Sequence, residues 1–223
     1  MDTKVKGLVI KLIDYKEADK LASIFTYEQG IITAKFRGVR RDSAKMKAIA
    51  QPFTFADFTM VGTSNNKTIA NANIIDNYYG IFTDYHKTMC GYIVLDMLKS
   101  ILPAEKREED LFLLTISALK NIETSDEYIS TIDYILQFLS FSGVGLELVD
   151  ADYVYLDTFT GDIKITKDAN STPLDKKVYR ILRSIATGEQ SEENTTIYKQ
   201  ILRMLHNIIY IRLGEDIKAF EFI

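Results

Sequence analysis

Residues 35–47 read KFRGVRRDSAKMK and contain six basic side chains and one acidic side chain. The stretch begins inside a run of alternating polarity, residues 31–37, in which the even-numbered side chains are apolar and Lys35 and Arg37 are cationic. A period of two predicts a β-strand with one face toward a core. After Gly38 the run continues as a cationic loop. A strand and loop of this kind suit a phosphate backbone, although Lys and Arg also protect solvated strand edges from aggregation.

Further runs of the same type flank the basic stretch. Strands are expected at residues 4–13, 21–26, 31–37, 53–60 and 68–75. The apolar phase changes within the fourth run, from Phe53 and Phe55 to Phe58 and Met60, which indicates a β-bulge or a bend. Short strands with one long basic loop after the third predict a small β-barrel of the OB type over residues 1–80.

The period becomes helical after residue 80. Apolar spacing with capping and stop signals predicts helices at residues 84–102, 108–123, 126–142, 173–187 and 195–213. The third has little polar surface and is expected to be buried. Residues 152–166 break the pattern and read as a β-hairpin that turns at Gly161. We therefore expect an α+β protein, with an OB-fold barrel followed by a helical domain, residues 81–223, that carries a small hairpin insertion.

The charge of the chain is divided unequally between these two parts. The net charge is −4, yet residues 1–80 hold twelve Lys and Arg against eight Asp and Glu, whereas the rest holds fifteen against twenty-three. One part can therefore bind a polyanion while the other avoids it.

Cations of the first part are the candidate phosphate contacts. The predicted DNA-binding residues are Lys35, Arg37, Arg40, Arg41, Lys45 and Lys47, with Lys4, Lys6 and Lys11 on neighbouring strands. Tyr15 lies in a polar segment and could stack on a base, whereas Phe36 has the parity of the core. The main alternative is an interaction scaffold whose basic barrel binds an acidic protein.

Residue types that carry catalysis or hold metals are scarce. One cysteine, Cys90, excludes an intramolecular disulfide and a cysteine-cluster zinc site, and the two histidines, His86 and His206, have no nearby sequence partners. No nucleotide-binding or nucleophile motif is present, so we expect a binding protein without a cofactor and not an enzyme. No apolar run approaches a transmembrane length, which favours a cytoplasmic protein without membrane contact.

Four segments in order resemble the RecO family of bacterial DNA repair proteins, which are recombination mediators. The first is GLVI at 7–10 with Tyr15, Glu17, Asp19 and FTYEQG at 25–30. The others are FRGVRR at 36–41 with Ser43, QPF at 51–53, and RLGEDIKA at 212–219. The resemblance implies an OB-fold, a helical C-terminal domain, binding of single- and double-stranded DNA, and annealing of complementary strands. It also implies contacts with RecR and with the tail of the single-stranded DNA-binding protein, recombinase loading, and association with the bacterial nucleoid.

One feature departs from that family. Many members carry a four-cysteine zinc module after the third helix, but residues 145–173 contain no cysteine here. Asp150 and Asp152 cannot replace thiolate ligands in such a site, so we expect a zinc-less member with the hairpin in place of the module. The hairpin is then either mobile or held by packing of side chains at its strands and turn, namely Tyr153, Tyr155, Phe159 and Ile163.

Overall fold

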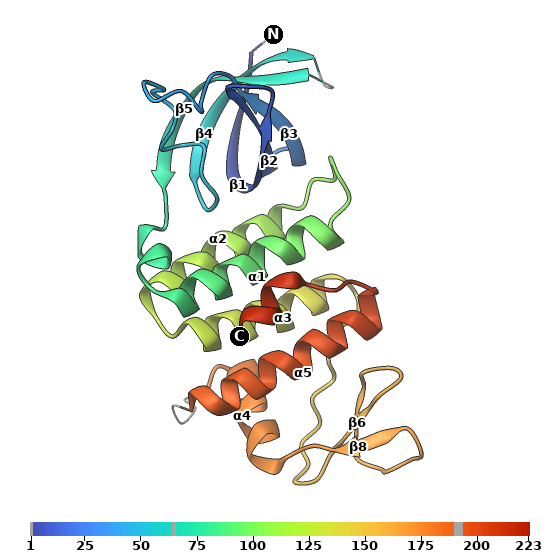
Figure 1. The fold of residues 1–223 in the computed structure, drawn as a ribbon. Coiled ribbons are helices and arrows are strands. Elements are labelled where there is room, and N and C mark those ends of the chain that lie inside the picture. Colours follow the sequence, from blue (N-terminus) through green and yellow to red (C-terminus); the bar gives the residue numbers. More distant parts are fainter. Residues whose placement is uncertain (1, 64–65, 190–193) are drawn as a thin grey trace. The chain divides into compact units, whose positions relative to one another are not determined.

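The computed structural model describes residues 2–63, 66–189 and 194–223 (Figure 1). The chain divides into two compact units. A barrel unit comprises Met1–Tyr79 and Met97–Ile116, and a helical unit comprises Gly80–Asp96 and Ser117–Ile223. A closed barrel of five strands followed by helices with a small sheet confirms the predicted α+β architecture.

Five strands close the barrel in the order β1-β2-β3-β5-β4 (Figure 1, blue to cyan). They are β1 (Thr3–Tyr15), β2 (Asp19–Thr26), β3 (Gly30–Phe36), β4 (Phe55–Thr63) and β5 (Asn66–Asp76). Neighbouring strands are antiparallel except β3 and β5, which pair in parallel through Ala34↔Lys67 and Lys35↔Thr68. The alternation that predicted β3 holds, because Ile32, Ala34 and Phe36 are buried while Thr33 and Arg37 are exposed.

The fourth strand begins later than predicted. Phe53 is buried in the connection before β4, with a positive φ of 66°. A register shift between Phe55 and Ala56, whose partners are Asp76 and Ile74, lies where the apolar phase changes and confirms the predicted irregularity. A second shift follows, where the partner of Thr59 is Asn71 and that of Met60 is Ile69. The extra residue of this bulge lies on β5, which bends there and helps the sheet to close.

Five helices and two short 3₁₀ segments follow the strands in the described chain (Figure 1, green to red). They are η1 (Tyr79–Thr83), α1 (Tyr85–Ile101), α2 (Glu109–Thr124), α3 (Glu127–Phe141), α4 (Lys176–Thr187), α5 (Thr195–Leu213) and η2 (Lys218–Phe222). Within the described residues, no helix combines the length and the apolarity that crossing a bilayer requires. The predicted burial of α3 is confirmed, because seven of its side chains are buried, among them Ile132, Ile135 and Phe138.

The segment between α1 and α2 completes the wall of the barrel unit. The first half of β3 lies next to this segment, where Ile31 bridges Ala104 and the amide of Glu105 donates to the Ile31 carbonyl at 3.1 Å. Gly30 has a φ of +70°, and a Cβ there would lie 2.1 Å from the Lys106 carbonyl oxygen. A side chain at position 30 would therefore push this segment off the strand.

The fourth helix also begins later than predicted. Pro173 does not open it but ends a strand, and Asp175 caps it, with Oδ1 accepting from the amides of Lys177 at 2.8 Å and Val178 at 3.0 Å. The predicted hairpin is present, and it gains a third strand that the sequence did not indicate. The sheet consists of β6 (Tyr155–Asp157), β7 (Ile163–Lys164) and β8 (Ser171–Pro173) in the order β7-β6-β8.

Packing and ion pairs both contribute to this small sheet. Of the four side chains predicted to pack, Ile163 is buried and Tyr155 half-buried, whereas Tyr153 and Phe159 are 74% and 77% exposed and cannot form its core. Buried Asp157 accepts from Lys164, which also reaches Asp168 at 3.0 Å. The hydrogen bond from Lys164, with those from backbone amides, lowers the pKa of Asp157 to about 2, and the same bond raises the pKa of Lys164 to about 12.

Arg212 of α5 ties the small sheet to the rest of the helical unit. Its guanidinium donates to the carbonyls of Val144 and Gly145 at 2.7 Å, to those of Thr160 and Gly161 at 3.2 and 3.0 Å, and to Asp162 at 2.7 Å. The side chain is 10% exposed. A planar fork with five donors suits this cluster of acceptors.

Residues 145–173 do not fit a zinc site. They hold neither cysteine nor histidine, and the described part of the chain has no group of three or more His, Cys, Asp or Glu placed around one metal position. The aspartates of this segment that face cations are Asp150 with Arg183, Asp152 with Lys176, Asp157 and Asp168 with Lys164, and Asp162 with Arg212. Charge pairing within the chain thus engages these carboxylates.

The Arg212 contacts predict a large loss of stability on substitution. Arg212→Met should lower the free energy of unfolding by about 3 kcal/mol, because it leaves several acceptors without a charged donor. Arg203→Met on the same helix is the matched control, since exposed Arg203 reaches a single backbone oxygen, that of Ile223, at 3.4 Å. Urea unfolding followed by circular dichroism measures both, and equal losses would show that Arg212 contributes no more than a surface arginine.

The Asp157–Lys164 pair predicts acid-sensitive stability. Because the folded pKa of Asp157, about 2, lies below its ordinary 3.8, the pair stabilises fully above about pH 4 and its contribution is lost as pH falls toward 2. This part of the pH dependence should be missing in Asp157→Asn. Asp152→Asn, which removes an exposed ion pair with Lys176, should retain it. Unfolding at several pH values compares the three chains, and parallel curves for Asp157→Asn and wild type would refute the assignment.

Candidate nucleic-acid interface

Two of the predicted cations share the outer face of β1, β2 and β3, and a third follows directly after β3. Residues paired directly across antiparallel strands point to the same side of a sheet. The register aligns Lys11 with Ser23 and Thr33, and the next row aligns Ile13 with Leu21 and Lys35. Arg37 follows β3 two residues after Lys35 and is exposed. The barrel therefore presents Lys11 and Lys35 on one face, and exposed Arg37 lies in the turn that follows β3.

The remaining predicted residues of the stretch lie on the β3–β4 connection, residues 37–54, here called the basic loop. Its first turn is bound to the β1–β2 hairpin. The amide of Gly38 donates to Asp19 Oδ1 at 2.7 Å, and the amide of Arg40 donates to the Ala18 carbonyl at 3.0 Å. The loop thus leaves β3 in a fixed direction.

The middle and the end of the basic loop are bound to the barrel as well. Val39, Ile49 and Ala50 are buried in the barrel core, and Met46 packs against it. Consecutive tight turns connect these anchors, and the amide of Phe53 donates to the Val9 carbonyl at 3.0 Å. The loop is an ordered surface and not a free arm, so its cations occupy defined positions.

Ion pairing divides the cations of the loop into two sets. Arg40 lies 3.3 Å from Asp14 and donates to the Lys16 carbonyl, and Lys47 lies 3.6 Å from Asp42. The others are exposed and form no ion pair with a described residue, namely Arg37, Arg41 and Lys45. Exposed unpaired cations are free to neutralise phosphates, whereas Arg40 and Lys47 would first have to leave an acidic partner.

Lys4 and Lys6 lie apart from this face. They belong to the first half of β1, where the strand pairs with β4 and Lys4 is opposite Thr59. Lys6 contacts Asp57 at 3.1 Å, and its backbone amide donates to Glu28. The β1 register shift between Val9 and Lys11 separates this half from the half that carries Lys11.

Tyr15 lies at the end of the face, half-buried between two ammonium groups. Lys35 Nζ is 5.2 Å and Lys16 Nζ is 5.5 Å from the ring centroid. An aromatic ring flanked by cations can receive a base and its phosphate together. Phe36 is buried in the core and packs edge-on against Phe58, as its parity predicted.

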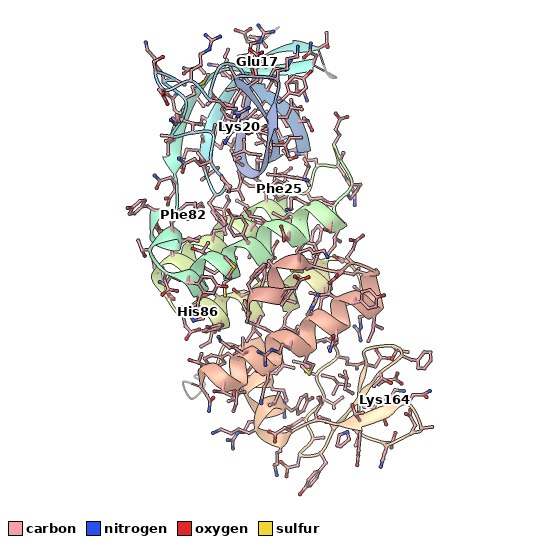
Figure 2. The ribbon with its side chains drawn as sticks, in the orientation of Figure 1. Glu17, Lys20, Phe25, Phe82, His86 and Lys164 are labelled. Carbon is pink, nitrogen blue, oxygen red and sulfur yellow. The ribbon has the colours of Figure 1, made fainter. Side chains whose placement is uncertain are left out.

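The structure adds two lysines that sequence patterns missed. Lys20 lines a groove between the hairpin and the basic loop together with Asp14, Arg40 and Lys47. Figure 2 shows Lys20 on the barrel wall and Glu17 at the β1–β2 turn. Lys67 joins Thr33 and Lys35 in a second groove beside β3, and its Nζ donates to Gln29 Oε1 at 3.0 Å. The parallel β3–β5 pairing brings Lys67 there, and spacing along the sequence carries no signal of that pairing.

The cysteine and the two histidines lie in the helical unit. Cys90 is buried, and this burial raises its pKa to about 12, so the thiol stays protonated. His206 pairs with Asp216 at 3.1 Å and stacks on Phe220. His86 packs against Tyr85 and Tyr128. His86 and Cys90, one turn apart on α1, both lie beside Tyr128, whereas His206 belongs to a different cluster of the helical unit.

Comparison with known proteins covers nearly the whole chain. Residues 1–78 match the family described as Recombination protein O N terminal, and residues 83–219 match Recombination protein O C terminal. Three similar curated proteins are named DNA repair protein RecO. That of Desulfitobacterium hafniense is 29% identical over 145 residues, 65% of this chain and 53% of the relative. That of Bacillus subtilis is 28% identical over 149 residues, which cover 66% of this chain and 58% of the relative.

The third relative, from Caldicellulosiruptor saccharolyticus, is 28% identical over 116 residues, which cover 52% of this chain and 48% of the relative. The chain thus spans about half the length of the curated relatives it matches. Both halves of the family pattern occur in order, the first over the barrel and the second over the helices. The chain therefore belongs to the RecO family of DNA repair proteins.

Proposed function

We propose that this protein is a DNA repair and recombination mediator that binds single- and double-stranded DNA through its barrel unit. The observation that supports this most is the set of unpaired cations on one ordered surface. Lys11 and Lys35 lie on the strand face, and Arg37, Arg41 and Lys45 on the adjoining loop. Binding through phosphates is largely independent of base sequence.

Annealing of complementary strands would follow from the same surface. Two DNA strands repel each other through their phosphates, and a cationic surface that holds both lowers that repulsion. Positioning and charge suffice, so the protein acts without covalent chemistry and without a cofactor. The grooves beside β3 and the basic loop would keep backbones close to Lys20 and Lys67.

Protein partners are proposed from membership in the family. RecR and the tail of the single-stranded DNA-binding protein would contact this chain, so that recombinase loads on DNA covered by that protein. With these partners the protein would act on DNA in the bacterial cytoplasm, at the nucleoid. We infer that residues 1–80 bind DNA. Protein partners would contact residues 81–223, which include the hairpin at about 152–166.

Charge reversal on the basic surface tests the DNA contact. Arg37→Glu with Arg41→Glu should abolish binding of a single-stranded oligonucleotide at moderate salt without unfolding the chain, because both side chains are exposed. Fluorescence anisotropy measures binding, and circular dichroism verifies folding. For the wild type, five unpaired cations predict a slope of log affinity against log salt of about −3.5, from about −0.7 per contact.

Two outcomes would contradict the proposal. If the folded double variant binds with unchanged affinity and salt slope, the basic loop is ordinary solvated surface. If an acidic polypeptide such as polyglutamate binds as tightly as an oligonucleotide of equal charge and competes with it fully, the barrel is a scaffold for an acidic protein.

Two lysines of β1, Lys11 and Lys6, test whether only the second half of that strand contacts DNA. Lys11→Gln should weaken binding and make the salt slope shallower by about 0.7, because Lys11 shares the face with Lys35. Lys6→Gln removes the same charge from the same strand but should change neither quantity, since Lys6 is paired with Asp57. Equal effects in the two variants would show that DNA contacts the whole length of β1.

A further inference from the structure

We propose that Asp19 is a positioning residue for DNA binding, which holds the basic loop in the shape that presents Arg37 and Arg41. This inference deepens the proposed function and rests on it. It assigns a favourable role to an acidic side chain on a surface that binds a polyanion.

The geometry places Asp19 at the point where the basic loop leaves the barrel. Asp19 begins β2, opposite Tyr15, and its Oδ1 accepts the Gly38 amide at 2.7 Å. Gly38 has a φ of +65°, which turns the chain between Arg37 and Arg41. The carboxylate therefore fixes a residue that lies between the two arginines of the proposed contact.

The neighbouring bonds show why this one acceptor matters. The Arg40 amide donates to the Ala18 carbonyl, and the Arg40 side chain reaches Asp14 and the Lys16 carbonyl. Each of these contacts joins the loop to the β1–β2 hairpin at residue 40. Asp19 supplies the contact closest to β3, so its removal loosens the turn at Arg37 and Gly38, while buried Val39 and the Arg40 contacts keep the loop on the barrel.

Loss of this acceptor raises the entropic cost of binding. A preorganised surface binds more tightly, because its side chains need not be immobilised when the ligand arrives. A loosened first turn lets Arg37 and Arg41 separate, so that both seldom meet the same backbone. Fewer simultaneous phosphate contacts also release fewer counterions, which makes the dependence on salt shallower.

Electrostatics alone predicts the opposite effect of the same substitution. Removal of any carboxylate from a cationic surface lowers its repulsion of phosphate and should tighten binding. Asp19→Ala and Asp19→Asn both remove the charge, but Asn keeps an oxygen that can accept the Gly38 amide. The two variants therefore separate charge from positioning.

We expect Asp19→Ala to weaken binding of a single-stranded oligonucleotide about fivefold, the equivalent of one ordinary hydrogen bond, with a salt slope shallower by about 1. Asp19→Asn should bind as tightly as the wild type or slightly more tightly, with an unchanged slope. Asp19→Val, a good strand residue without an acceptor, replaces the alanine variant if alanine unfolds the chain. If Asp19→Asn and the variant without an acceptor bind the oligonucleotide with the same affinity, whether tighter or weaker than the wild type, the proposal is overturned.

Limited trypsin digestion without DNA keeps this test independent of the proposed function. A loosened loop exposes its lysines and arginines, so Asp19→Ala should be cut faster within residues 37–47 than the wild type or Asp19→Asn. Equal cutting of all three would show that Asp19 does not order the loop. If Arg37→Glu with Arg41→Glu leaves DNA binding intact, the proposed DNA contact fails, and the digestion still decides whether Asp19 positions the loop.

Discussion

The pleat of β3 is the constraint on which the rest of the barrel surface depends. Its even-numbered side chains close the core, so Thr33, Lys35 and the following Arg37 must face outward. A shift of one residue would place the two cations in the core and the apolar residues in water, which makes this register strongly specified. Burial of Ile32, Ala34 and Phe36 therefore displays the cations as well as stabilising the fold.

The sequence predicts the parts of the interface that follow from periodicity. The alternation in β3 and the composition of the loop identify the free cations Lys35, Arg37, Arg41 and Lys45. Pattern reasoning could not separate Arg40 and Lys47 from them, because ion pairs with Asp14 and Asp42 depend on how the loop folds. It also grouped Lys6 with Lys11, since the bulge that separates them leaves no signal in composition.

The small sheet shows the same limit in the helical unit. Tyr153 and Phe159 have the composition of a hairpin core, yet both face solvent. Sheets of two or three residues per strand bury too little apolar surface to be stable alone. The Asp157–Lys164 pair and the Arg212 fork add directional contacts that such a sheet can use. These contacts join residues of different elements, and spacing along the chain does not predict them.

The net charge of the whole chain says little about where a polyanion could bind, because the relevant charges are local. At physiological ionic strength, exposed charges more than about 8 Å apart are largely screened, so the charges close to the basic surface decide its local potential. Acids close to the site act differently from acids far away. Asp14 and Asp19 hold the basic loop against the hairpin, and each lowers the local charge in doing so. A loop of cations alone would repel itself and stay extended, whereas a few acids at its base convert it into a fixed surface.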